Sequence, residues 1–351
     1  MTGESPSRQS RPGCPKQGSG PVSRRSVLLA GGAAAALLVG YPLLKHRFAT
    51  KKPVFIASGQ SYQGDLVRTI RDGLVACGLD PATLKGKKVL LKPNMVEPAR
   101  DRPQMTTHPA VILAANEVFR GWGATVKVGE APGHIRDTEF ALWASRIGDA
   151  LDAQKIPFAD LNYEEVGFVP NGGKVSRLPG LFFPGSVLEA DYVVSMPKLK
   201  THHWVGITCA MKNLYGTLPG IKYGWPKNVL HHAGIPETVV DINASLPKTL
   251  AIVDAITCME GDGPILGSPK EMGLIVCGTC PIALDATCAR IMGLEPKLVP
   301  YLATGTRLLG PLDDWRIEQR GDGWERHHSP FQILDEPHLR EMQAKPEILV
   351  T

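Results

Sequence analysis

The body of this chain alternates between short apolar runs and segments with helical periodicity. Residues 54–57, 87–91 and 124–128 are apolar runs of strand length, and residues 65–77 and 111–119 between them repeat apolar side chains at helical spacing. Strands separated by helices of this length pair in parallel through right-handed crossovers. The alternation therefore predicts an α/β fold: one or more mostly parallel sheets with flanking helices, in Rossmann-like halves that form one body or two lobes.

The most informative stretch is residues 191–216, where a strand pattern ends in a polar cluster. An apolar run rich in β-branched residues stops at Pro197, which cannot donate to a sheet ladder. The polar residues that follow are Lys198, Lys200, Thr201, His202, His203, Lys212 and Asn213. In open α/β sheets, ligands bind just beyond the carboxyl ends of the strands. Crowded cations repel one another unless an anion or carboxylates lie between them, so this stretch predicts an anion site.

Two earlier strands also end in polar residues. Lys92 and Asn94 follow the strand at residues 87–91, and Glu130 and His134 follow the strand at residues 124–128. Parallel strands bring their carboxyl ends to one edge of a sheet, so these side chains are expected to line the same cleft. Each of them alone also fits a structural role, such as a solvated lysine, a turn, or a carboxylate that neutralises a nearby lysine.

The second half supplies candidate metal ligands. Adjacent histidines point in different directions, so we expect at most one of each His-His pair to bind a common ion. His202, one of His231 or His232, and either Asp254 or Asp262 would form a mixed nitrogen and oxygen site for a divalent metal. Their spacing matches no known ligand motif. The alternative is that lysines and histidines bind an anion while the acids orient them. The Gly- and Pro-rich loop at residues 217–228 is a candidate lid.

These motifs resemble domain-of-unknown-function family 362, an uncharacterised group of α/β proteins. The resemblance covers about residues 54–305 and includes VLLKPNMVEP, THPAVILAANEVFRGWGATVKVGEAPG, PKLKTHHWVGITCAMKNLYG, IVDAITCMEGDGPILG and IALDATCARIMGLEP. It implies an α/β fold and functional positions at Lys92, Asn94 and Glu130, but no substrate. Some relatives carry a ferredoxin-like module, whose C-x2-C-x2-C-x3-C-P run is absent here, so no iron–sulfur cluster is expected.

Several other function classes lack their motifs. Neither nucleotide fingerprint occurs, and no G-x-S-x-G accompanies a serine nucleophile. Cys277 and Cys280 form a C-x-x-C in which the second thiol precedes a predicted helix, a position that lowers a thiol pKa. A thiol redox partner is therefore retained as an alternative.

The N-terminal segment predicts export. Residues 1–52 hold nine Lys and Arg and one Glu, so the formal charge of +5 becomes 5 − 8 = −3 for the remainder, which argues against nucleic-acid binding. Residues 23–29 (SRRSVLL) fit a twin-arginine signal, and residues 27–44 are apolar. The expected partner is the twin-arginine translocase and the expected location extracytoplasmic, with this segment either cleaved or kept as the only membrane anchor.

We therefore expect a leader (residues 1–52), an α/β domain (53–305, with candidate lobes 53–165 and 190–305) and a C-terminal extension (306–351). The predicted function is an enzyme acting on a small anionic substrate, with a non-catalytic metal- or anion-binding accessory protein as the alternative. Candidate catalytic residues are His202, Lys200 and Lys212. Candidate binding residues are Lys92, Asn94, Glu130, Lys198, Thr201, Asn213, Asp254 and Asp262, and candidate metal ligands are His202, His231 and Asp254.

Overall fold

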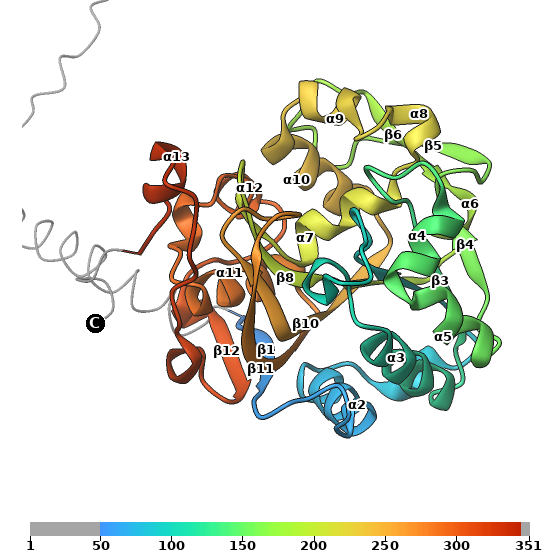
Figure 1. Cartoon of the computed structure of the whole chain (residues 1–351), viewed down its shortest axis with the longest axis horizontal. Coiled ribbons are helices and arrows are strands. Elements are labelled where there is room, and N and C mark those ends of the chain that lie inside the picture. The colour runs from blue at the N-terminus through green and yellow to red at the C-terminus, as the bar shows by residue number, and fades with distance from the viewer. Residues whose placement is uncertain (1–49, 345–351) are drawn as a thin grey trace, which may run out of the picture. The chain divides into compact units, whose positions relative to one another are not determined.

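The computed structural model describes residues 50–344, and from Lys51 onward these form one compact unit around a ten-stranded sheet (Figure 1). The predicted leader lies almost entirely outside the described residues. The main path of the sheet runs β12 (Ile317–Gly321), β1 (Lys52–Ala57), β11 (Ser268–Gly278), β10 (Lys248–Glu260), β7 (Tyr192–Met196), β2 (Lys88–Pro93), β3 (Thr125–Glu130) and β4 (Phe158–Asp160). Strands β8 (Lys198–His202) and β9 (Gly206–Thr208) branch from β10.

The centre of the sheet is parallel, which confirms the predicted α/β fold. Strands β10, β7, β2, β3 and β4 pair in parallel in that order, so their carboxyl ends meet at one edge. Strands from both candidate lobes lie in this one sheet. Strand β12, from the C-terminal extension, pairs in parallel with β1 at the other side of the sheet.

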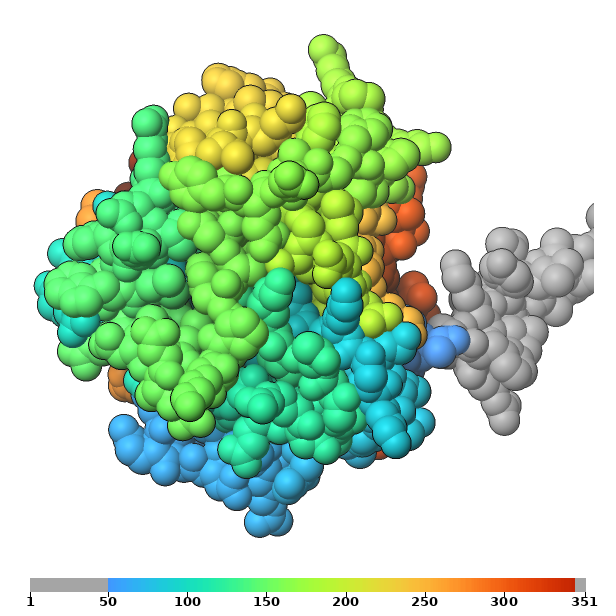
Figure 2. Space-filling view, turned by 90° about the vertical axis from the view of Figure 1, so that its right-hand side faces the viewer, coloured from blue at the N-terminus to red at the C-terminus, as the bar shows by residue number. Residues whose placement is uncertain are grey.

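Helices cover both faces of the sheet because its strands are apolar on both sides. One face packs α2 (Leu66–Ala76), α3 (Pro109–Gly121), α4 (Thr138–Ser145) and α5 (Ile147–Ala153). The other packs α7 (Ala210–Asn213), α10 (Ile235–Ser245), α11 (Pro281–Ile291) and α12 (Pro300–Gly305). Shorter helices are α6 (Gly185–Leu188), α8 (Gly220–Tyr223), α9 (Asn228–His232) and α13 (Pro337–Arg340). The segments around α4, α5 and β4, in green, form much of the side seen in Figure 2.

Two local features of the fold follow from capping and turn chemistry. Asp137 caps α4 by accepting a hydrogen bond from the Phe140 amide at 2.9 Å. The Asn171-Gly172-Gly173 turn chemistry lies between β5 (Val166–Pro170) and β6 (Gly180–Pro184), which pair antiparallel. Among the described residues, no helix has both the length and the apolar character needed to cross a membrane.

One local expectation was wrong. Pro197 does not end the extended backbone, because β8 resumes one residue later and pairs in parallel with β10. Strands β10 and β11 are long and form an antiparallel hairpin. A proline removes only its own donor, and the register of a neighbouring strand decides whether pairing resumes beyond it.

Candidate functional site

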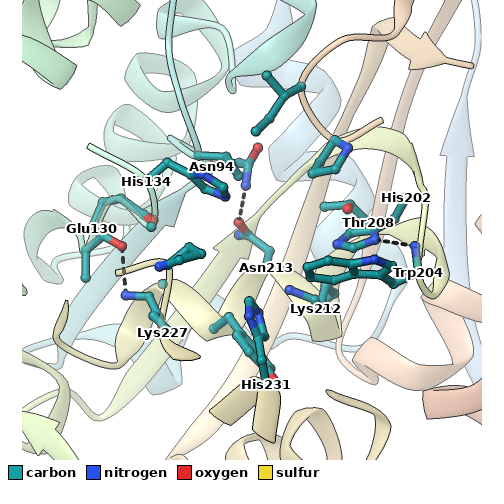
Figure 3. Close-up of a pocket in the computed structure, with 18 of the residues that line it drawn as sticks. Asn94, Glu130, His134, His202, Trp204, Thr208, Lys212, Asn213, Lys227 and His231 are labelled. Carbon is teal, nitrogen blue, oxygen red and sulfur yellow. Dashed lines mark hydrogen bonds between the residues drawn. The ribbon is translucent and has the colours of Figure 1, made fainter. Parts of the chain in front are cut away.

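A pocket of about 120 Å³ opens beyond the carboxyl ends of β2 and β3, beside β8 and α7 (Figure 3). This is the edge at which open α/β sheets bind ligands. Its polar and aromatic lining comprises Asn94, Glu130, His134, His202, His203, Trp204, Thr208, Lys212, Asn213, Tyr215, Lys227 and His231. Since drug-sized ligands occupy pockets of about 300 Å³ or more, this one suits a much smaller molecule.

A buried polar network lies at the base of the pocket. The Lys92 ammonium forms an ion pair with Glu130 and donates a hydrogen bond to Asn213 Oδ1 at 3.1 Å. Asn94 Nδ2 donates to the same oxygen at 3.1 Å, and Asn213 Nδ2 donates to Ser195 Oγ at 3.1 Å. The predicted meeting of Lys92, Asn94, Glu130 and Asn213 is therefore present in the structure.

Lys92 and Glu130 balance each other. Burial lowers the pKa of Lys92 and raises the pKa of Glu130, while the attraction between the two charges opposes both shifts. Glu130 supplies the carboxylate in the pocket lining, and its charge is already paired with the Lys92 ammonium. Removing one partner of a buried ion pair destabilises a protein by several kcal/mol. We therefore expect Lys92 and Glu130 to form a rigid floor beneath the pocket, and together they add no net charge to it.

Lys212 is a pocket cation to which the described residues offer neither a carboxylate nor a hydrogen-bond acceptor. It lies on α7, is half-buried, and its Nζ is 4.0 Å from the centroid of the Tyr215 ring. Among the described residues it forms no ion pair and donates no hydrogen bond. Burial, together with the nearby Lys92 charge, lowers the pKa of Lys212 to about 8. An ammonium in this setting favours an anion at hydrogen-bond distance.

Four imidazoles surround Lys212: His134, His202, His203 and His231. Burial and the Lys212 charge hold the pKa of His202 well below its usual range and lower the pKa of His231 to about 4. Both rings are therefore neutral at pH 7. Nδ1 of His202 accepts a hydrogen bond from the Trp204 amide at 3.1 Å, which leaves the ring proton on Nε2. His202 can thus donate a hydrogen bond to a bound ligand.

Two side chains at the pocket have an unpaired polar atom. Asn94 is 4% exposed and Thr208 is 3% exposed, and both line the cavity. Within the described part of the chain, Asn94 Oδ1 and Thr208 Oγ1 have no hydrogen-bond partner. Because buried polar atoms are rarely left unpaired, these two indicate that the pocket is shaped for a polar ligand.

Two further lysines of the region are held by backbone carbonyls. Lys227 donates to the carbonyl oxygens of Ala131 and Leu218, which anchors the predicted lid loop to the base of the pocket. Lys200 donates to the carbonyl oxygens of Met105 at 2.9 Å and of Pro264 at 3.1 Å, and it does not line the pocket. Burial lowers the pKa of each of these lysines to about 7.

Other predicted site residues lie away from the pocket. Lys198 pairs with Asp254 at 2.6 Å, and both side chains are fully buried. Thr201 Oγ1 donates to the Gly261 carbonyl at 2.9 Å. Asp262 approaches the site only through His203, 3.8 Å away. The structure therefore does not bring Lys198, Thr201 or Asp254 to the pocket.

The three candidate metal ligands do not converge. His202 and His231 line the pocket, but the Asp254 carboxylate is already bound by Lys198 and by the His108 amide at 2.9 Å. In residues 50–344, no group of three or more His, Cys, Asp and Glu side chains is placed to hold a metal ion. The combination proposed from the sequence was wrong because strand pairing gives Asp254 a lysine partner.

Several pocket residues were not predicted from the sequence. The sequence places Lys227 in the loop at residues 217–228 and Tyr215 near the end of the 191–216 stretch, without a site role for either. It also assigns no role to Trp204 or Thr208. Lys227 adopts a left-handed backbone conformation at φ 69°, and its Nζ donates to the Ala131 and Leu218 carbonyls. No sequence motif marks that conformation in a lysine.

The thiols are buried rather than activated. Burial raises the pKa of Cys280 despite its place at the start of α11, and it raises the pKa of Cys277 strongly. The expected lowering at a helix N-terminus was therefore wrong, because desolvation of the sulfur outweighs the helix. The six cysteines of the described residues are free.

The chain is similar to known proteins in sequence and in structure. "Thylakoid-associated protein sll1697" from Synechocystis sp. is 29% identical over 263 residues, which are 73% of this chain and 79% of that protein. The lactate racemase apoprotein from Thermoanaerobacterium thermosaccharolyticum is 18% identical, with a TM-score of 0.41 over 71% of this chain and 58% of that one. This chain thus spans less than two thirds of that structure. A model for "Domain of unknown function (DUF362)" matches residues 89–290, a range that includes all the residues lining the pocket, and the chain belongs to this family.

Proposed function

We propose that this protein is an enzyme that acts on a small anionic substrate in the Lys212 pocket. The observation that carries this proposal is the Lys212 ammonium, which lies in a pocket among neutral imidazoles and has no carboxylate partner among the described residues. An anion would supply the missing charge. The structural lysines of this region have protein partners, since Lys198 pairs with Asp254 while Lys200 and Lys227 donate to backbone carbonyls, whereas the described residues offer Lys212 neither kind of partner.

The pocket supplies distinct roles for a bound anion. Lys212 binds its negative charge, and His202 donates from Nε2 to a substrate oxygen and so assists proton movement. Asn94 and Thr208 offer unpaired atoms for orientation, and Asn213 holds Asn94 in place. Lys198 and Lys200 have other partners, so we do not expect them to contact the substrate.

Titration calorimetry with acetate, pyruvate and phosphate tests the binding step. Lys212→Met should weaken binding by about tenfold or more, the loss expected for one charge-assisted hydrogen bond. Lys222→Met is the matched control, because Lys222 is an exposed lysine of α8 that does not line the pocket. Equal affinities for wild type and Lys212→Met would reject the anion site.

Turnover separates an enzyme from a binding protein. We expect wild type to exchange carbon-bound hydrogen of a bound short-chain carboxylate with D2O, seen by proton NMR, and Lys212→Met to lose this exchange. Tight binding of the same carboxylates with no chemical change across the panel would favour a non-catalytic accessory protein.

We further propose that the protein is exported by the twin-arginine route. Support comes from the SRRSVLL stretch at residues 23–29 and from a relative whose printed name describes it as thylakoid-associated. Arg24→Lys with Arg25→Lys should retain the protein in the cytoplasm, measured by cell fractionation. Mass analysis of the mature N-terminus then distinguishes a cleaved signal from a retained anchor. Unchanged fractionation of the double variant would reject this route.

A further inference from the structure

Four buried or half-buried lysines lie around the pocket, and only Lys212 has a side-chain nitrogen without a partner in the part of the chain that the structure describes. Lys92 is paired with Glu130, and Lys200 and Lys227 donate to backbone carbonyls. The Lys212 Nζ has no hydrogen bond or ion pair among the described residues, and its contact is the face of the Tyr215 ring. A lysine nitrogen that is held in place without donating to a neighbour is available as a nucleophile once it loses its proton.

The neighbouring groups favour attack on a carbonyl compound. His202 is neutral and carries its ring proton on Nε2, so it can donate to a carbonyl oxygen and polarise the bond. The His231 ring is also neutral and makes no hydrogen bond within the described residues, so a ring nitrogen can accept a hydrogen bond from the ligand. The lowered pKa of Lys212, about 8, leaves part of the amine unprotonated near neutral pH.

From this geometry, and resting on the proposed function, we propose that Lys212 forms an imine with a short-chain 2-oxo acid. The carboxylate of such a substrate would match the positive charge of the pocket. Its 2-oxo group would match a nucleophile, Lys212, beside a hydrogen-bond donor, His202. The cavity of about 120 Å³ limits the substrate to a few carbon atoms. The unpaired hydroxyl of Thr208 is a donor for the carboxylate.

The chemical step balances without an added reagent. The Lys212 ammonium first releases a proton to solvent, as its pKa of about 8 allows near neutral pH, and the amine then attacks the carbonyl carbon while the carbonyl π electrons move to oxygen. A nitrogen-bound proton moves to that oxygen, and the C–O bond breaks as the oxygen takes one proton back from solvent. The ammonium and the carbonyl compound thus become a protonated imine and one water molecule.

Borohydride trapping tests the inference on the full-length protein. Wild type incubated with pyruvate and sodium borohydride should gain the mass of one reduced adduct, located on Lys212 by peptide mapping. Lys212→Arg should lose the adduct and Lys222→Met should keep it. Propionate, which lacks the 2-oxo group, should bind to wild type and leave no adduct.

The outcomes separate the two proposals. Binding of pyruvate and propionate without a trapped adduct overturns the imine and leaves the anion site intact. An adduct shared between Lys212 and exposed lysines also overturns it, since it reports surface chemistry. Failure of every carboxylate and of phosphate to bind overturns the proposed function and the imine together.

Discussion

The Asp285 carboxylate accepts a hydrogen bond from the Ala210 amide at 2.8 Å, so α11 holds the start of α7. Its second oxygen accepts from the Met211 amide at 3.0 Å and from the Tyr301 hydroxyl at 3.2 Å. Lys212 follows directly in the chain. Asp285 is therefore a positioning residue for the pocket lysine, although it lies outside the pocket.

Asp285→Asn should destabilise the protein and misplace Lys212. The amide group keeps one acceptor and turns a donor towards a backbone N–H, so one hydrogen bond is lost and two donors face each other. We expect a loss of about 1–3 kcal/mol in the free energy of unfolding, measured with denaturant. A structural role alone would leave the affinity of the folded variant for acetate unchanged, whereas a positioning role weakens it. Glu325→Gln, at an exposed acid, is the control.

Lys200 should contribute a rise in stability with pH above 7, which competes with an opposite contribution from the buried thiols. The folded pKa of Lys200 is about 7, below the usual value for an unfolded chain of about 10.4, so the unfolded state binds more protons between these limits. The free energy of unfolding then increases with pH, by at most about 1.4 kcal/mol per pH unit for each such lysine. Denaturant curves at pH 7, 8 and 9 measure this slope.

Lys200→Met should reduce that slope, and Lys222→Met should leave it unchanged because Lys222 is exposed. A slope that is equal in wild type and Lys200→Met would contradict the lowered folded pKa of Lys200, because the buried thiols add the same opposing pH dependence to both proteins.

Gly216→Ala should disrupt the base of the pocket. A Cβ at this position would overlap the Glu130 carboxylate and lie 2.6 Å from Lys92 Nζ, so the buried ion pair would have to move. Overpacking costs about 1–3 kcal/mol, and separation of the pair adds to this. Thermal unfolding is the measurement. Gly121→Ala, which has no atom within 4 Å of the added Cβ, should unfold near the wild-type temperature. Equal unfolding temperatures for the two variants would argue against close packing of Gly216 on the Lys92–Glu130 pair.

His202 substitutions should separate hydrogen-bond donation from packing. His202→Gln keeps a side-chain donor, whereas His202→Phe keeps a ring and removes the donor. We expect the Phe variant to bind pyruvate about tenfold more weakly and the Gln variant to retain most of the affinity, by calorimetry. If Gln and Phe lose affinity equally while both fold, Nε2 is not the donor to the ligand.

Part of the fold and of the site followed from local patterns. Apolar runs separated by helical segments predicted parallel strands, and the carboxyl ends of parallel strands share one edge. Lys92, Asn94 and Glu130 therefore meet Asn213 as expected, since strand direction alone brings them together. Asp137 and the Asn171-Gly172-Gly173 turn were likewise readable because caps and turns depend on neighbouring residues.

The sequence by itself determined that an α/β sheet carries a group of lysines, histidines and amides at one edge. Only the tertiary structure decided which lysine is left for a ligand. The pairing of β8 with β10 sets Lys198 opposite Asp254, and packing directs Lys200 to backbone carbonyls, whereas Lys212 keeps an unengaged ammonium. The physical reason is that a charge takes its partner from whichever segment lies beside it. Long-range strand register and the burial that shifts each pKa are not encoded in local spacing.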